Sequence, residues 1–166
     1  MKQILICLAC IAPLTAWAAT NPDESFFKHA AEGGIAEVDA GKLAQDKGNT
    51  QKVKDFGAMM VKDHAAANEK LKALAASKTV TLPASASVGE MATKAKLDVL
   101  SGDTFDKSYI KDQIKAHHAT IALFKKEISE GQDGDVKAFA SDTLPTLRSH
   151  LKAIQGIAAD EGVSEK

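Results

Sequence analysis

The stretch YIKDQIKAHHATIALFKKEI, residues 109–128, decides how the rest of the chain is interpreted. Its apolar side chains recur at alternating steps of four and three residues, which places them on one face of a helix. They are Ile110, Ile114, Ile121, Phe124 and Ile128. This stripe is continuous only if His117 belongs to it. Because a buried imidazole costs free energy unless its nitrogens find partners, His117 predicts polar partners on other helices.

Three other helical segments each carry one polar residue within an apolar stripe of the same kind. These residues are Glu37 in the stripe at 27–44, His64 in the stripe at 53–74 and His150 in the stripe at 136–157. The sequence therefore predicts three histidines and one carboxylate that point inward, one from each of four helices.

The heights of these residues along the helices also agree. At about 1.5 Å of rise per residue, Glu37 and His64 lie about 17 and 21 Å from the predicted turn at 48–50. By the same rise, His117 and His150 lie about 21 and 24 Å from the predicted turn at 131–134. His64 and His117 are also near the midpoints of their helices, so we expect all four groups to meet at the centre of a bundle.

The first residues have the pattern of a cleaved secretory signal. Lys2 precedes an apolar run from 4 to 14, and Ala16-Trp17-Ala18 has the small-x-small spacing of a cleavage site. The run is too short to span a bilayer. We therefore predict a signal peptide at 1–18 and a periplasmic mature chain without a membrane span.

Composition excludes several other classes of protein. The formal charge of the 166-residue chain is −1, and loss of Lys2 with the signal makes it −2. A balance this near neutral argues against a nucleic-acid partner or a polybasic membrane anchor. Both cysteines, Cys7 and Cys10, lie inside the predicted signal. The mature chain then has neither disulfides nor thiolate metal ligands.

The remaining sequence predicts an all-α domain at 21–160, followed by a frayed tail at 161–166. Asn21-Pro22 begins a first helix that runs to about 47, and the second runs from about 50 to 78. Residues 79–104 are far more than a helix hairpin needs, and they contain a short amphipathic piece. Asp103 or Thr104 is the expected cap of the third long helix, and the fourth runs from 134 to about 160. Pro145 predicts a kink in that last helix.

The predicted central layer is a plausible set of ligands for a divalent transition metal. Imidazole nitrogen and carboxylate oxygen suit Zn²⁺, Cu²⁺, Fe²⁺ or Mn²⁺, so the candidate metal ligands are Glu37, His64, His117 and His150. The alternative is a metal-free layer in which Glu37 accepts a hydrogen bond from an imidazolium. His118 and His29 fall outside this layer. We interpret them as surface residues or as residues that contact the ligands but not the metal. Asp63 could orient an imidazole, but it points about 100° away from its neighbour His64.

Four segments together resemble a bacterial family called domain of unknown function 4142. They are GGIAEV, MMVKDHAAANEKL, AHHATIALFKKE and TLPTLRSHL, within a resemblance that covers about 25–157. Its members are often named as exported or outer-membrane proteins, and the family is similar to ferritin-like four-helix bundles. The resemblance thus implies such a bundle, with a short extra helix in the long connection between the second and third helices. It also allows an association with the outer membrane. The family's histidine motifs match His64, His117 and His150, and its first-helix glutamate matches Glu37.

Two features of this chain differ from the family pattern and from ferritin-like di-iron enzymes. The family often has an acidic residue just before the third-helix histidine, where this chain has Ala116. Ferritin-like di-iron oxidases need about four inward carboxylates and two histidines, whereas this core offers one carboxylate and three histidines. Ferroxidase activity is therefore not expected.

Three functions remain open at this point. The first is a periplasmic metal-binding bundle that sequesters or buffers a transition metal, for example under envelope stress. The second is a structural or interaction module of the envelope, in which a metal-free polar layer fixes the helix register. The third is a hydrolase or oxidase that uses an open metal position. An enzyme is the least favoured, because no nucleophile elbow, phosphate loop or pair of catalytic carboxylates is present in the sequence.

Overall fold

The structure, a computed structural model, describes residues 22–164, which form five helices and no strand. The helices are α1 (Pro22–Lys47), α2 (Gln51–Ser77), α3 (Val88–Asp98), α4 (Gly102–Glu130) and α5 (Gly134–Asp160). The all-α prediction is confirmed, including the short extra helix, α3, in the long connection. The predicted signal peptide lies outside the described residues.

Helices α2, α3 and α5 begin where side chains satisfy their first free amides. Thr50 caps α2 by accepting a hydrogen bond from the Val53 amide, and Asp133 caps α5. Ser87 and Glu90 form a reciprocal capping box at the start of α3. The predicted cap of α4 was wrong, because α4 begins at Gly102 after Ser101, which makes no side-chain capping bond.

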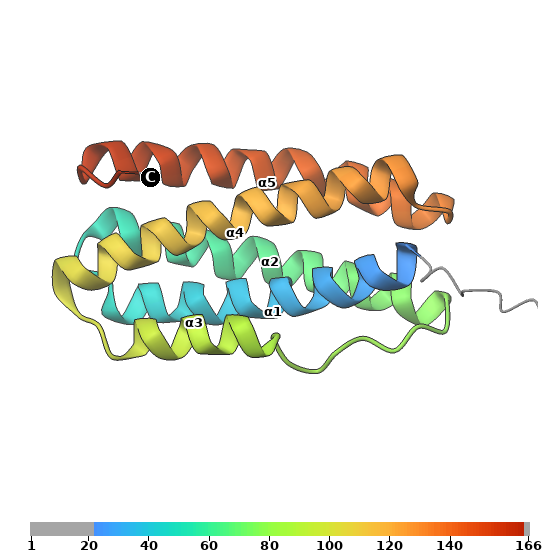
Figure 1. Ribbon diagram of the computed structural model, residues 1–166, viewed down its shortest axis with the longest axis horizontal. Coiled ribbons are helices and arrows are strands. Elements are labelled where there is room, and N and C mark those ends of the chain that lie inside the picture. The colour runs from blue at the N-terminus through green and yellow to red at the C-terminus, as the bar shows by residue number, and fades with distance from the viewer. Residues whose placement is uncertain (1–21, 165–166) are drawn as a thin grey trace, which may run out of the picture.

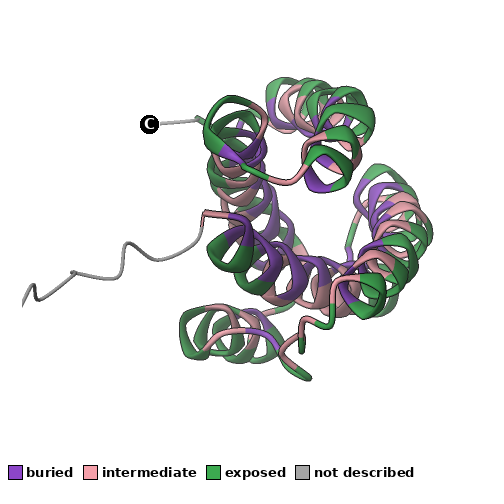
Figure 2. Cartoon of the chain, turned by 90° about the vertical axis from the view of Figure 1, so that its right-hand side faces the viewer, coloured by how far each residue is buried: buried purple, intermediate pink, exposed green. Residues whose placement is uncertain are grey.

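The four long helices pack as two hairpins that turn at opposite ends of the bundle (Figure 1). The α1–α2 turn lies at the left of the view and the α4–α5 turn at the right, and the connection that carries α3 runs back along the bundle between them. α1 packs against α2 and α4, and α5 packs against α4 and α2. Their buried faces turn toward one another, whereas α3 lies outside the ring of long helices (Figure 2).

A buried carboxylate from the other hairpin holds each turn. Asp106 at the start of α4 accepts hydrogen bonds from the Asn49 and Thr50 amides, at 2.8 and 2.9 Å. Asp23 at the start of α1 accepts from the Gln132 and Asp133 amides, at 2.9 and 3.2 Å. These bonds fix the heights of the two hairpins relative to each other at both ends of the bundle.

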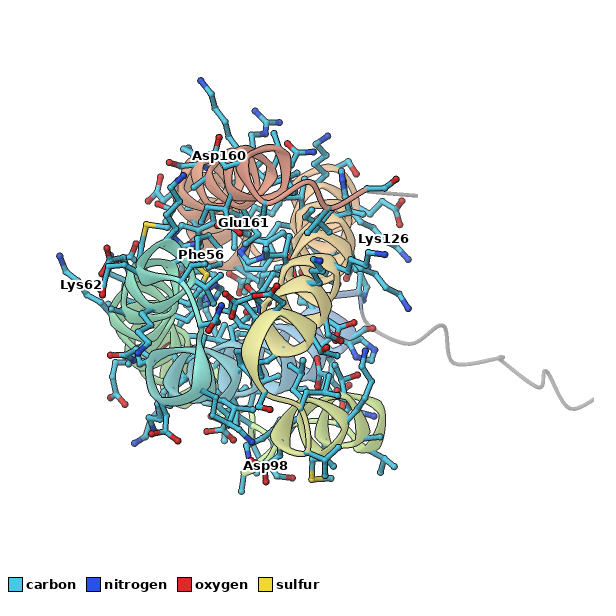
Figure 3. All side chains as sticks on the ribbon, turned by 90° about the vertical axis from the view of Figure 1, so that its left-hand side faces the viewer. Phe56, Lys62, Asp98, Lys126, Asp160 and Glu161 are labelled. Carbon is cyan, nitrogen blue, oxygen red and sulfur yellow. The ribbon has the colours of Figure 1, made fainter. Side chains whose placement is uncertain are left out.

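The apolar core consists of two clusters. One contains Phe26, Phe27, Leu71, Phe124, Val136 and Leu147, and the other contains Val53, Phe56, Met60, Phe105, Ile110 and Ile154. Figure 3 shows Phe56 inside the ring of helices and Lys62 and Lys126 at its periphery. On α2, α4 and α5 a histidine falls between the residues of the two clusters, so a polar layer separates two apolar halves.

The first hairpin depends on a close contact between α1 and α2. A Cβ atom at Gly57 would lie 2.6 Å from the Gly41 carbonyl oxygen, and one at Gly41 would lie 2.7 Å from the Gly57 oxygen. These distances are too short for any side chain, so only glycine at both positions allows the two backbones to approach this closely.

The end of the chain differs from the sequence-based expectation at one point. α5 continues through Pro145 to Asp160, as predicted. The segment after it was expected to fray, but Val163 is buried in the second apolar cluster and its amide donates to the Ala158 carbonyl. Gly162, at a φ of 63°, allows the chain to reverse there. Among the described residues, none of the helices has both the length and the apolar character that a bilayer crossing requires.

We predict that Gly57→Ala destabilises the protein by about 1–3 kcal/mol, because the added methyl group forces α1 and α2 apart. Gly156→Ala is the matched control, since Gly156 is exposed on α5 with open space around it. The control should stabilise the protein by about 0.5–1 kcal/mol through helix propensity. Urea unfolding measures both effects. Equal effects of the two changes would contradict the close contact.

A second prediction concerns Glu127, which is 2% exposed beside the α4–α5 turn. Burial and then a hydrogen bond with Asp23 raise its pKa from 4.5 to about 7. The folded protein thus keeps a proton that the unfolded chain releases, so stability falls as pH rises through this interval. Glu127→Gln, which cannot ionise, should gain stability relative to the wild type between pH 4.5 and 7.

Urea unfolding of chelator-treated protein at several pH values measures this difference. Glu130→Gln is the control, because Glu130 is exposed on the same helix. Histidine titrations affect both proteins alike and cancel in the comparison. A difference between Glu127→Gln and the wild type that stays constant from pH 4 to 8 would refute the prediction.

Candidate metal centre

Three of the four predicted site residues meet at the centre of the bundle. His64 comes from α2, His117 from α4 and His150 from α5, and their exposed fractions are 7%, 1% and 2%. Their ring centroids lie 5.9 Å apart for His64 and His117, 5.4 Å for His64 and His150, and 5.6 Å for His117 and His150. The predicted equal height of these residues is therefore correct.

One ring nitrogen from each histidine lies within 4.8 Å of the other two. Nitrogens bound to one tetrahedral Zn²⁺ at 2.0–2.1 Å would be about 3.3 Å apart. Small rotations of the rings, moving nitrogens by at most about 1.5 Å, would close that difference. The arrangement can thus hold a single metal ion.

Each histidine also keeps one buried nitrogen that no described residue satisfies. These atoms are His64 Nε2, His117 Nε2 and His150 Nδ1. A buried polar atom without a partner costs about 1–3 kcal/mol, so three in one place need an explanation. Lone pairs that face a shared metal ion provide one, and the residues present fit that ion.

Two of the rings are oriented by hydrogen bonds on their opposite nitrogens. His117 Nδ1 lies 2.9 Å from the Gln113 carbonyl oxygen, which can only accept. The proton must therefore be on Nδ1, which leaves the Nε2 lone pair free. His150 Nε2 lies 3.0 Å from Asp63 Oδ2, and this bond leaves Nδ1 free in the same way. Such bonds fix the tautomer of metal-binding histidines.

Burial disfavours the charged form of two of the three imidazoles, those of His64 and His150. Burial, reinforced by His117 and His150, lowers the pKa of His64 to about 3. Burial also lowers the pKa of His150, although its bond to Asp63 acts in the opposite direction. Neutral imidazole is the form that binds metals, so these shifts favour metal binding near neutral pH.

The predicted fourth ligand, Glu37, does not join this group. Its Oε2 accepts a 2.7 Å hydrogen bond from Gln113 Nε2, and its Oε1 lies 3.8 Å from His117 Nδ1. Glu37 therefore lies behind His117, on the side away from the free Nε2. Burial raises the pKa of its carboxyl group, while His117 and Gln113 act in the opposite direction. The stripe correctly predicted that Glu37 is buried, but it contained no information about which nitrogen of His117 the carboxylate would meet.

Asp63 is a functional residue that the sequence left undecided. It points away from the stripe of its own helix, yet it reaches His150 on the neighbouring helix α5. The other two histidines lie outside the centre, as expected. His118 is exposed, and the exposed His29 pairs with Glu32 at 3.2 Å.

A cavity of about 40 Å³ lies beside the cluster. Its walls include His64 and His150, together with Glu37, Asp63 and Asn68, and more apolar residues from all four long helices. His117 is not part of its lining. A metal held by three imidazoles commonly keeps its fourth position for water or another ligand, and this cavity adjoins two of the three imidazoles, His64 and His150.

Comparison with solved structures shows that the fold recurs at low sequence identity. A DUF305 fragment from Deinococcus radiodurans has a TM-score of 0.75 at 13% identity, covering 86% of this chain and 98% of that one. CopM in a Cu(II)-bound form has a TM-score of 0.71 at 14% identity, covering 83% of this chain and 96% of that one. CopM in a Cu(I)-bound form has a TM-score of 0.69 with the same identity and coverage. At these identities the likeness concerns the fold alone.

Comparison with curated proteins gives no match. A family model described as Domain of unknown function (DUF4142) matches residues 10–157. This match covers most of the sequence, and it includes all three histidines and Glu37. The chain therefore belongs to the DUF4142 family.

Proposed function

We propose that this protein is a periplasmic metal-binding bundle that holds one transition-metal ion through His64, His117 and His150. The observation that carries the proposal is the set of three buried nitrogens without partners at the centre of the bundle. In this role the protein would sequester or buffer the metal, with no chemical step required. The CopM structures, which contain copper or silver in a similar fold, support the same conclusion.

The donor set narrows the choice of metal. Imidazole suits copper, zinc and iron, whereas manganese favours carboxylate, carbonyl and water ligands. Because Glu37 lies behind His117 rather than beside the free nitrogens, the site offers three nitrogens and no carboxylate. We therefore propose copper, zinc or iron, and we no longer include manganese among the candidates.

The proposed location rests on the N-terminal sequence. Lys2, the apolar run and the Ala16-Trp17-Ala18 site form the pattern of an export signal. We propose periplasmic export on that basis, and a ferritin-like bundle that can associate with the outer membrane on the basis of the family resemblance.

The competing proposal is a structural module in which the polar layer contains no metal. The hydrogen bonds on the outer nitrogens of His117 and His150 are compatible with it. The bond of His150 to Asp63 and that of His117 to Gln113 would form with or without a metal. That function leaves the three inner nitrogens without partners, which is why we prefer the metal site.

The two adjacent histidines of α4 provide a sharp test. His117→Ala should abolish high-affinity metal binding, because it removes one of three ligands. His118→Ala is the matched control and should retain it, since His118 is exposed. Calorimetric titration of metal-free protein with Cu²⁺, Zn²⁺ and Fe²⁺ measures both. In wild type, metal at about 100 times its dissociation constant should also add about 2.7 kcal/mol of stability.

Two results would count against the proposal. Loss of binding in His118→Ala with retention in His117→Ala would show that the wrong histidine had been assigned. A wild-type protein that ignores all of these metals would favour the metal-free layer.

The last prediction for this site concerns Asp63 as a positioning residue. Asp63→Asn should weaken metal binding by about 10–100-fold, because the neutral amide no longer holds the His150 ring as a carboxylate does. Asp55→Asn is the control, since Asp55 is exposed on the same helix and bonds only to Gln51 in the described structure. Stopped-flow or competition titration gives the affinities. The role of Asp63 is refuted if the two variants bind metal equally well.

A further inference from the structure

A groove on the surface of the bundle lies between α2 and α5, which pack against each other more loosely than either does against its hairpin partner. Its volume is about 310 Å³. The cavity beside the histidines adjoins this groove and is itself partly open, so the two together lead from the surface to His64 and His150. The residues that line both are Asp63 and Ala67 from α2, and Phe139, Thr143 and Thr146 from α5.

The charged residues along this passage favour a cation. The groove has two carboxylates, Asp63 and Asp142, against one ammonium group, that of Lys70. The cavity is lined by Asp63 and a second carboxyl group, Glu37, and by the exposed His29, and its described lining contains no lysine or arginine. An excess of carboxylates in a groove raises the local concentration of divalent cations.

The size of the cavity requires an entering ion to lose water. A metal ion in solution carries a shell of about six waters, and a cavity needs about 10–15 Å³ for each water. The cavity of about 40 Å³ holds about three. Its wall offers oxygen atoms in exchange, from Asn68, Thr120, Thr143 and Thr146. The Thr143 hydroxyl donates to the Phe139 carbonyl at 2.8 Å, which leaves the lone pairs of its oxygen free.

Asp63 connects this passage to one of the proposed ligands. Its side chain is 32% exposed, and its Oδ2 lies 3.0 Å from His150 Nε2. A cation held at Asp63 is thus one residue away from the histidines. The cavity also adjoins a groove beside α3, but there Glu37 and Gln113 are buried and joined by a 2.7 Å hydrogen bond. The groove between α2 and α5 is therefore the more direct approach.

From these observations we infer that the groove between α2 and α5, with the cavity beside it, is the entry route of the metal. Asp63 and Asp142 attract a hydrated divalent cation to the groove, and oxygen atoms of the cavity wall replace part of its water before it reaches His64 and His150. This inference rests on the proposed metal site and deepens it, because it gives the buried ligands access to metal without separation of the helices.

The test compares rates with affinities in the full mature chain, with Cu²⁺, Zn²⁺ and Fe²⁺ as probes. Transfer of bound metal to an excess of a chromogenic chelator gives the release rate, and competition with the same chelator gives the dissociation constant. The uptake rate constant is the release rate divided by the dissociation constant. A side chain that only obstructs the route slows uptake and release by the same factor, so the dissociation constant does not change.

Three alanines provide matched variants. Ala67 is half-buried and lines both the groove and the cavity, whereas Ala65 is exposed on the same helix and lines neither. Ala67→Leu should slow uptake and release alike by about tenfold, because the larger side chain must move aside for the ion to pass. Ala65→Leu should match the wild type. Ala119→Leu, which narrows the groove beside α3 instead, should also match it.

The charge of the groove is tested at two exposed residues that do not line the cavity, Asp142 and Lys70. Asp142→Asn should slow uptake by about threefold at low ionic strength, and Lys70→Gln should speed it by a similar factor. Both effects should disappear at high salt, because exposed charges are then screened. Asp55→Asn is the control, since Asp55 is exposed on α2 and does not line the groove.

The outcomes separate this inference from the proposed function. A wild-type chain that takes up none of the three metals overturns both. Metal uptake that is equally fast in the wild type and in folded Ala67→Leu overturns the entry route alone. Slower uptake in Ala119→Leu but not in Ala67→Leu also overturns it, and assigns entry to the groove beside α3. If Ala67→Leu does not fold, equal uptake rates in Asp142→Asn, Lys70→Gln and the wild type at low ionic strength overturn the route.

Discussion

The burial of three imidazoles at one level of an apolar core is the constraint on which this structure depends. Each ring loses its hydrogen bonds to water when it is buried. Hydrogen bonds to Gln113 and Asp63 replace them only at the outer nitrogens of His117 and His150. The inner nitrogens have no described partner. A metal ion would satisfy all of them at once. The nitrogens without partners are therefore both the energetic cost of burying the layer and the basis of its proposed function.

The rest of the bundle holds the helices at the heights that this layer requires. A slip of one helix by a single turn would move its histidine by about 5.4 Å and separate it from the others. The Gly41–Gly57 contact fixes α1 against α2. Asp23 and Asp106 tie the two hairpins together at opposite ends. These features lie outside the histidine layer, but they determine whether the three nitrogens meet.

The apolar stripes were enough to predict the fold and most of the site from sequence. Helix periodicity gave the inward faces of His64, His117 and His150, and the residue counts to each turn gave their common height. The sequence could not show at which end each hairpin turns, because that depends on bonds such as Asp106 to Asn49 across more than fifty residues. Nor could it separate Glu37 from the ligands, since periodicity gives the face of a helix but not the atom that a side chain meets. Asp63 was left undecided because the helix period places it about 100° from the stripe of α2, and that rotation does not show that its carboxylate reaches His150 on α5.

The central claim is that the three histidines hold a metal ion in the native protein. Elemental analysis of the full chain, exported by its own N-terminal segment and purified without an affinity tag, tests this most directly. The account predicts copper, zinc or iron at one ion per chain. A protein that is free of metal as isolated, and that takes up none of these metals when they are added, would contradict it.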